Sequence, residues 1–344
     1  MNVSINIKWP LIILLMLPFT LAIGCLIQIK HFAPEPLILK KDEIFTLPSG
    51  TNYAGLEKLL RRQHLAKKTC WLPWLIKLEP KLAEVKAGTY RLQPGMTVRD
   101  LLNLLVSGKE AQFSIQFIEG ERLKEWLTVL SRAPYMKHDL HDVTPQTLGV
   151  KLGDPADSIL EGEFYPDTYL YTATTSDSAI LKRARQRMKL MLLKIWEGRA
   201  EGLPYETPQE LLIMASIVEK ETAIKEERAR VASVFINRLR AGMKLQTDPT
   251  VIYGISEDYH NSITRRDLMT PTPYNTYIIN GLPPTPIAMP GQASLKAAAH
   301  PEESEYLYFV ADGRGGHVFS TNLASHNQAV RKYRQGHDIR GNNE

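Results

Sequence analysis

The longest uninterrupted apolar run of the chain lies near its N-terminus. Residues 9–29 contain no charged side chain, and Lys8 and Lys30 bound the run on either side. As a helix, these 21 residues would extend ~32 Å, which is enough to cross the core of a bilayer. The pattern therefore predicts a transmembrane helix, with residues 1–30 forming a short cytoplasmic tail and an anchor.

Two other fates of this segment stay open. A signal peptide that is cleaved off would show a similar apolar run, and the sequence AIGC at 22–25 would also suit lipid attachment at Cys25. The flanking lysines do not decide the orientation of a span. We place the body of the chain outside the membrane, because an anchor that precedes a large domain also serves as its export signal.

Beyond the anchor, the pattern alternates between short strands and amphipathic helices. Two prolines predict an extended stalk over residues 31–42. Strands followed by turns are expected at 43–50 and 87–95, and helices at 53–65 and 97–105, the second capped by Thr97. Residues 43–111 are therefore predicted to form a small α+β module, which resembles the LysM-like subdomain of some cell-wall enzymes. A plain spacer domain is the alternative.

Residues 112–344 are predicted to form a second, larger α+β domain. Alternation at 112–118 indicates a half-buried strand, and helices are expected at 119–130 and 176–200. The segment 161–171 (EGEFYPDTYLY) is rich in aromatic residues and is interrupted by Pro166, so it fits neither a regular helix nor a central strand. Its tyrosines could line a groove for sugars or bases, or could equally be core residues. At the C-terminal end, residues 306–320 predict a β-hairpin and 322–333 a closing helix.

One helix carries the clearest chemical signal. Residues 211–218 (LLIMASIV) are apolar nearly all round, which predicts a buried helix, and they end in Glu219, Lys220 and Glu221. At 100° per residue both glutamates extend an apolar face, where burial would favour the protonated form that a general acid needs. Spacing does not choose between them. No second carboxylate in the sequence stands out as their partner, and the helix could instead simply emerge into solvent at Glu219.

The elements that follow favour a functional site at this helix end over a simple exit into solvent. A second helix at 226–241, ending at Gly242, would fix the end of the first one. The loop 246–250 (QTDPT) then supplies an amide, hydroxyls and a carboxylate, a density of hydrogen-bonding groups that suits a sugar. Turn chemistry at Asp248 would also explain part of this loop.

Composition narrows the ligand classes. The net charge of +5 is spread along the 344 residues, which gives little support for nucleic-acid binding. The chain has two cysteines, too few for a disulfide framework or a multi-cysteine zinc site, and its nine histidines form no HExxH pair. We expect no metal and no cofactor.

Several long motifs occur in a fixed order along the chain. They are MASIVEKET at 214–222, VASVFINRL at 231–239, LQTDPTVIYG at 245–254, PYNTY at 273–277, GLPP at 281–284, SLKAAAHP at 294–301, YLYFVADG at 306–313 and NLASHN at 322–327. Together they closely resemble the endolytic murein transglycosylases, the YceG-like family. One departure is at 161–169, where we would expect tryptophans at some of the positions of Glu163, Tyr165 and Tyr169.

The resemblance implies a function and a site. It identifies Glu219 as the catalytic residue of a peptidoglycan lytic transglycosylase, which cleaves bonds between N-acetylmuramic acid and N-acetylglucosamine within glycan strands and leaves 1,6-anhydro ends. The substrate's own hydroxyl is the nucleophile, so no second carboxylate is required, unlike in the two-carboxylate hydrolases. Expected substrate-binding residues are Gln246, Thr247, Asp248, Asn275, Tyr277, Tyr165 and Glu221, although a well-hydrogen-bonded core would explain several of them equally well.

The remaining expectations concern architecture and setting. The catalytic domain should have a lysozyme-like helical core and lie in the periplasm, held to the bacterial inner membrane by a single span. Expected partners are peptidoglycan strands and peptidoglycan synthases of the penicillin-binding type, next to which cleavage would end the elongation of a nascent strand. The rival functions are a membrane-tethered, non-catalytic peptidoglycan-binding scaffold and a muramidase that hydrolyses the same bond.

Overall fold

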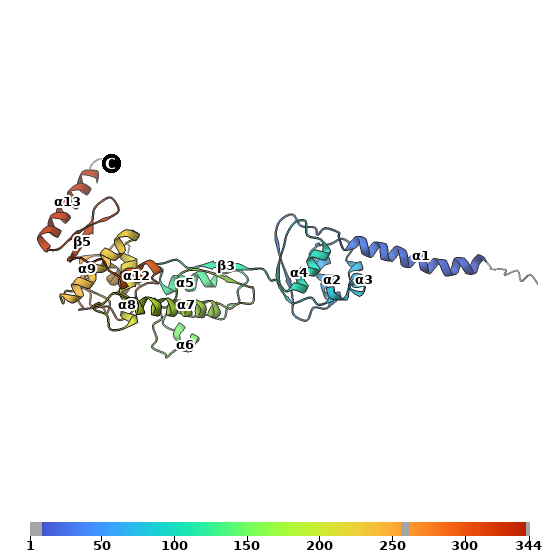
Figure 1. Cartoon of the computed structure of the whole chain (residues 1–344), viewed down its shortest axis with the longest axis horizontal. Coiled ribbons are helices and arrows are strands. Elements are labelled where there is room, and N and C mark those ends of the chain that lie inside the picture. The colour runs from blue at the N-terminus through green and yellow to red at the C-terminus, as the bar shows by residue number, and fades with distance from the viewer. Residues whose placement is uncertain (1–8, 256–261, 342–344) are drawn as a thin grey trace, which may run out of the picture. The chain divides into compact units, whose positions relative to one another are not determined.

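The computed structural model of the protein describes residues 9–255 and 262–341 (Figure 1). Helices and two-stranded antiparallel sheets give the mixed α+β fold that the sequence predicts. The chain divides into two compact units, each described here by itself. Unit 1 comprises Met1–Phe113 with Tyr171–Thr174, and unit 2 comprises Ser114–Leu170 with Thr175–Glu344.

Unit 1 is built around one antiparallel strand pair and its own apolar core. Strand β1 (Glu43–Leu47) pairs with β2 (Gly88–Leu92), with Phe45 opposite Tyr90, and both of these rings are buried. Its helices are α1 (Trp9–Phe32), α2 (Tyr53–Arg62), η1 (Thr69–Trp71), α3 (Leu72–Leu78), η2 (Pro80–Ala83) and α4 (Val98–Ser107). As predicted, Thr97 caps α4, in a capping box with Asp100, and Gly108 ends it in the left-handed conformation.

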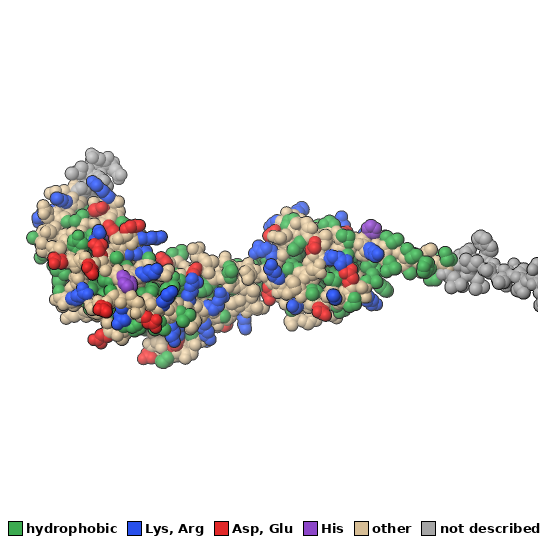
Figure 2. All heavy atoms as spheres, viewed as in Figure 1, with side chains coloured by type: hydrophobic (Ala, Val, Ile, Leu, Met, Phe, Trp, Pro, Cys, Tyr) green, Lys and Arg blue, Asp and Glu red, His purple; other side chains and the backbone are tan. Residues whose placement is uncertain are grey.

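Helix α1 covers the residues of the predicted anchor. No helix in the described part of the chain is long and apolar enough to cross a membrane. The predicted span begins at Trp9, and the side chains of residues 9–15 lie outside the described part. From Met16 to Ile27 the described portion of α1 exposes large hydrophobic side chains, which Figure 2 shows in green along its visible face.

The predicted stalk packs against unit 1. Leu37 is buried, its N–H donates to the Met96 carbonyl at 2.7 Å, and the Ile38 N–H donates to the Leu65 carbonyl at 2.9 Å. Two prolines predict an extended stalk over 31–42, and in the structure apolar residues of this segment contribute to the unit 1 core. The segment is therefore an edge of the module in this structure.

Unit 2 holds the candidate chemistry. Its first elements are β3 (Phe113–Gln116, starting in unit 1), α5 (Leu123–Ser131), α6 (Leu148–Leu152), β4 (Thr168–Tyr171, ending in unit 1) and α7 (Asp177–Glu197). These are followed by α8 (Pro208–Glu221), η3 (Lys225–Glu227), α9 (Arg228–Arg240), α10 (Asp248–Gly254), α11 (Arg265–Met269) and α12 (Gln292–Ala299). The hairpin β5 (Tyr308–Ala311) with β6 (His317–Ser320) and helix α13 (Leu323–Gly341) complete it.

Helix α8 is the centre of this unit. Thr207 and Glu210 form a capping box at its start, and Pro208 occupies the first turn, where no N–H is needed. All eight residues from Leu211 to Val218 are buried, as the apolar run predicts. Their surroundings are α7, α9 and α12, whose apolar residues belong to the same core. The buried Ser216 hydroxyl is satisfied, since it accepts the Ile287 N–H at 3.0 Å.

The start of α5 differs from the prediction. The sequence favoured a helix from Glu119, but α5 begins at Leu123, and residues 119–120 form a turn. The Gly120 N–H donates to the Met289 carbonyl at 2.8 Å, and the Met289 N–H donates to the Glu121 carbonyl at 2.9 Å. Gly120 has φ +78°, a conformation that glycine adopts at little cost. This turn leaves the Glu119 side chain free of the helix.

Candidate active site

The Glu219 carboxylate is held at the C-terminal end of α8 by two donors. Arg228, the first residue of α9, donates from Nη2 to Oε1 at 3.0 Å, and the Gly291 N–H donates to Oε2 at 2.9 Å. Both side chains of the ion pair are nearly buried, with 8% of Arg228 and 5% of Glu219 exposed. Charge-assisted bonds to both oxygens fix the position of the carboxylate.

A second carboxyl group lies beside it. The Glu119 side chain rests against Gly291, so closely that a Cβ added at that glycine would overlap its carboxylate. Gly120 lies on the Glu219 side chain, since a Cβ there would come within 3.6 Å of Glu219 Cγ. Gly291 therefore contacts both glutamates: its N–H donates to Glu219, and its Cα lies against the Glu119 side chain.

This arrangement perturbs Glu119. Partial burial of its carboxyl group and the neighbouring charge of Glu219 raise the pKa of Glu119, while Arg228 and Lys225 offset part of that rise. Two carboxyl groups at close range resist ionising together. The raised pKa of Glu119 favours its protonated form, the form that a general acid requires.

Glu221 belongs to a different cluster, on the other side of the helix end. The Thr247 hydroxyl donates to Glu221 Oε1, and burial raises the pKa of Glu221 to about 7, with the Asp248 charge adding to the rise and the Thr247 hydrogen bond opposing it. Tyr277 Oη in turn donates to Asp248 Oδ1 at 2.6 Å. Four of the predicted substrate-binding residues, namely Glu221, Thr247, Asp248 and Tyr277, are brought together here.

The other three predicted residues have structural partners. Asn275 is fully buried, and its amide donates to the carbonyls of Asp267, Leu268 and Thr270. Gln246 is exposed, but its side-chain oxygen accepts a bond from Arg238 at 3.2 Å, and its φ of +52° marks a strained turn.

Tyr165 does not line a groove. Its side chain is part of the unit 2 core with only 7% exposed, and the Arg187 guanidinium lies over the ring at 4.8 Å. Neither Asn275 nor Tyr165 offers a free face to a sugar in this structure. Both satisfy interior packing, which the sequence had left as the alternative.

The groups that the sequence did not single out are Glu119, Arg228 and Gly291. Glu119 had been assigned to a helix, where its side chain would point elsewhere, and its approach to Glu219 depends on the pairing of residues 119–121 with Met289. Arg228 follows two glutamates in the sequence and looks like part of a solvated charge run. The dipeptide Glu119-Gly120 directly after a strand was the available signal, because glycine there marks a turn.

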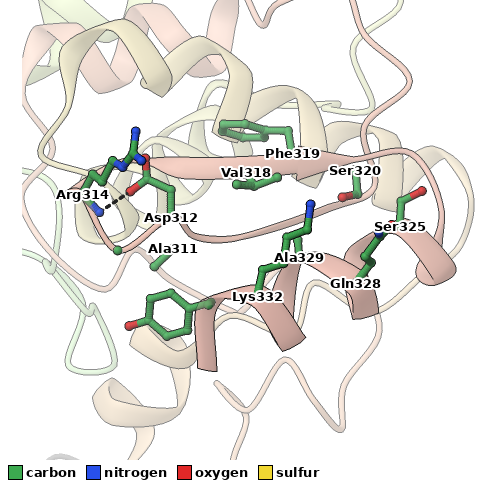
Figure 3. A pocket seen from close by; sticks show the side chains of 12 residues that line it. Ala311, Asp312, Arg314, Val318, Phe319, Ser320, Ser325, Gln328, Ala329 and Lys332 are labelled. Carbon is green, nitrogen blue, oxygen red and sulfur yellow. Dashed lines mark hydrogen bonds between the residues drawn. The ribbon is translucent and has the colours of Figure 1, made fainter. Parts of the chain in front are cut away.

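No group of three or more His, Cys, Asp or Glu residues that could hold a metal occurs in the described ranges. A hollow of about 480 Å³ lies between the β5–β6 hairpin and α13, where Figure 3 shows Asp312 and Arg314 at one end and Ser325 and Gln328 at the other. None of the predicted site residues lines it. The candidate acid–base groups are therefore Glu219 and Glu119, with the Glu221 cluster at the same end of α8.

The model of the YceG-like family matches residues 45–332, which include both glutamates of this pair. The chain belongs to the YceG-like family. The endolytic murein transglycosylase of Bacillus subtilis is 30% identical over 307 residues, covering 83% of each chain. That of Streptococcus pneumoniae strain R6 is 28% identical over 328 residues, covering 86% of this chain and 59% of the relative, so this chain spans about three fifths of the pneumococcal protein.

A solved YceG-like structure shares the fold. The YceG-like protein of Listeria monocytogenes is 29% identical, superposes with a TM-score of 0.52, and covers 84% of this chain and 99% of its own. The resemblance inferred from the motifs is thereby confirmed at the level of the family. The match to the family model covers most of both units, since the matched residues begin within β1 and end within α13.

Proposed function

We propose that the protein is an endolytic peptidoglycan lytic transglycosylase in which Glu219 acts as acid and base. The observation that carries the proposal is the fixed Glu219 carboxylate with Glu119 beside it, in a YceG-like chain whose curated relatives bear the name endolytic murein transglycosylase. Acid–base catalysis by a positioned carboxyl group contributes on the order of 10²–10⁴ to a rate.

In the proposed reaction, the protonated carboxyl group of Glu219 gives its proton to the oxygen of the glycosidic bond. The bond from C1 of the muramic sugar to this oxygen breaks, and positive charge develops on the sugar ring. The C6 hydroxyl oxygen of the same sugar then bonds to C1, and its proton returns to Glu219. The product is a 1,6-anhydro end, and no water enters.

Glu119 has a supporting part in this proposal. Burial and the Glu219 charge raise the pKa of Glu119, and its carboxyl group lies beside Glu219, where it is proposed to supply the proton that Glu219 delivers to the substrate. Arg228 and the Gly291 N–H hold Glu219 in one orientation while charge moves on the substrate. The Glu221, Thr247, Asp248 and Tyr277 cluster is proposed to contact the sugars.

The test is a comparison of Glu219→Gln with the wild-type chain on purified peptidoglycan. We expect the variant to fold normally and to release anhydromuramyl products at least ~100-fold more slowly. Glu226→Gln, an exposed glutamate in the following 3-10 turn, is the matched control and should keep full activity. Product at the wild-type rate from Glu219→Gln would refute the assignment.

A muramidase that hydrolyses the same bond is the second candidate, and the Glu119–Glu219 pair is the observation that favours it. Two-carboxylate glycosidases need a second group to activate water or to attack the sugar. Mass spectrometry of the products separates the two reactions, because hydrolysis adds one water to each new end. A scaffold without catalysis would bind peptidoglycan and leave strand lengths unchanged.

For the setting of the protein, we propose a single-pass anchor in the bacterial inner membrane and a periplasmic catalytic domain. The apolar surface of α1 from Met16 to Ile27 supports this, as a continuous exposed apolar patch favours lipid or protein contact. A LysM-like role for unit 1, a lysozyme-like core in unit 2 and work beside a synthase belong to the same proposal. Full-length chain that washes off membranes in high salt would contradict the anchor.

A further inference from the structure

A basic hollow adjoins the carboxylate pair within unit 2. It encloses about 650 Å³ between α7, the start of α9 and α12. Four cationic side chains and one histidine line it, and no Asp or Glu is among the described residues of its wall; the basic residues are Lys194, Lys225, Arg228, Lys296 and His300. Several like charges in one concavity produce a local positive potential that attracts anions.

Arg228 is shared between this hollow and the acid–base pair. Its Nη2 bonds Glu219, while its Nε is buried and has no hydrogen-bond partner within the described residues. A buried donor without a partner is unfavourable, and more so when it is charged. The side chain is more than nine-tenths buried and lines the hollow, so an anion there would lie against a guanidinium whose hydrogen bonding the described residues leave incomplete.

Two further observations place the hollow next to the reacting carboxyls. Gln292 lines its wall, and the preceding residue, Gly291, donates its N–H to Glu219. Lys225 and Arg228 also lower the pKa of Glu119 through their charge, which requires them to lie near it. An anion bound here would therefore lie close to the bond that is cleaved.

We propose that this basic hollow binds the carboxylates of the peptide stems that the glycan strand carries. The inference rests on the proposed function and names which part of the substrate the hollow would recognise. The N-acetylated sugars of peptidoglycan are uncharged once their lactyl groups are joined to peptides, so the negative charge of the polymer comes from peptide carboxylates. A lysine cluster binds such groups as point charges, and Arg228 adds directional hydrogen bonds.

The experiment compares two substrates and two variants of the full chain. The substrates are glycan strands with intact peptides and the same strands stripped of peptides by an amidase, with the lactyl carboxylates that this frees then converted to uncharged methylamides. Lys194→Gln combined with Lys296→Gln should lower kcat/KM on the peptide-bearing strands about tenfold, chiefly through a higher KM, because two exposed charges that would attract a peptide carboxylate are lost. On stripped strands the double variant should match the wild type.

The matched control is Lys182→Gln with Lys189→Gln, two exposed lysines of α7 outside the hollow. This control should behave as the wild type on both substrates. An equal loss on both substrates for the pocket variant, or no loss on either, would overturn the proposal.

Binding separates this inference from the proposed function. Calorimetry with a soluble muramyl peptide should show binding to the Glu219→Gln chain, weakened about tenfold in the same chain with the two pocket substitutions added. If the wild type cleaved neither substrate, the proposed function would fail. This binding test would still show whether the hollow binds the peptide. Binding of inorganic phosphate without binding of the muramyl peptide would overturn the peptide assignment.

Discussion

Three glutamates near the end of α8 differ in what surrounds their carboxyl groups. Glu219 faces an arginine and a backbone N–H, Glu119 faces Glu219, and Glu221 faces a hydroxyl with an aspartate behind it. The same functional group thus has three environments: Glu219 is held in place by two donors, the pKa of Glu119 is raised by partial burial and then by the Glu219 charge, and the pKa of Glu221 is raised to about 7 by burial. Helical spacing could nominate Glu219 and Glu221, but the environments that distinguish them come from distant loops.

Gly291 allows us to test the role of Glu119. The substitution Gly291→Ala places a Cβ where the Glu119 carboxylate lies, and the flexible glutamate must turn away. We expect catalysis to fall about tenfold or more with little change in thermal stability, since repositioning a catalytic group by about 1 Å is costly. Gly24→Ala, whose Cβ would meet nothing within 4 Å, is the control. Full activity of Gly291→Ala would show that Glu119 need not lie beside Glu219.

Glu161 makes stability depend on pH. Burial raises its pKa from 4.5 to about 7, although the Leu123 N–H and the Tyr253 hydroxyl bond the carboxylate and lower it. Between these pH values the folded chain binds a proton that the unfolded chain has lost, so stability falls as pH rises. Each pH unit in that window is worth about 1.4 kcal/mol, which makes the whole effect on the order of 3 kcal/mol.

Glu161→Gln should remove the part of the slope that Glu161 contributes and leave the part that the buried Glu221 contributes. Denaturant unfolding should give similar free energies for both chains at pH 4, and a more stable variant at pH 8. The control Glu303→Gln changes an exposed side chain and should leave the slope as it is in the wild type. A wild-type slope in Glu161→Gln would mean that this carboxyl group is ionised in the folded protein throughout.

At the scale of elements, α8 depends on its first turn as well as on its apolar length. The Thr207 hydroxyl accepts the Glu210 N–H at 3.3 Å, and Glu210 bonds back to the Thr207 N–H at 3.1 Å. Thr207→Ala should cost about 1 kcal/mol of unfolding free energy, as the loss of a cap usually does. Thr128→Ala, whose hydroxyl bonds a carbonyl within α5, is the comparison and should cost less. Equal losses of unfolding free energy in the two variants would indicate that the Thr207 cap stabilises the protein no more than an ordinary hydroxyl hydrogen bond does.

Local sequence was sufficient for most elements, and for the site it nominated Glu219 and Glu221 without choosing between them. The run at 211–218 predicts α8, and Thr97 with Gly108 bounds α4, because caps and apolar period are properties of neighbouring residues. The start of α5 could not be predicted, since pairing between residues 119–121 and Met289 joins segments far apart in the chain. The same pairing brings Glu119 to Glu219. The burial of Tyr165 and Asn275 likewise depends on packing partners that periodicity does not reveal.

At the scale of the molecule, each unit has a core of its own. Leu101 is fully buried in unit 1 and Leu295 in unit 2. Replacing either leucine by alanine should cost about 2–5 kcal/mol in its own unit. Calorimetry of Leu101→Ala should therefore lower one thermal transition and leave the other in place, with the reverse pattern for Leu295→Ala. A common shift of a single transition would show that the two units unfold together.

The composition of unit 1 has a practical consequence for dissecting the protein. Because residues 171–174 belong with the N-terminal residues, the polypeptide leaves unit 1 at Phe113, returns briefly, and leaves again. No single cut in the gene separates the two units: a fragment that starts at residue 114 still carries four residues of unit 1, and one that stops at 113 lacks them. To excise unit 2 alone, a short connector would have to replace residues 171–174 and join residue 170 to residue 175.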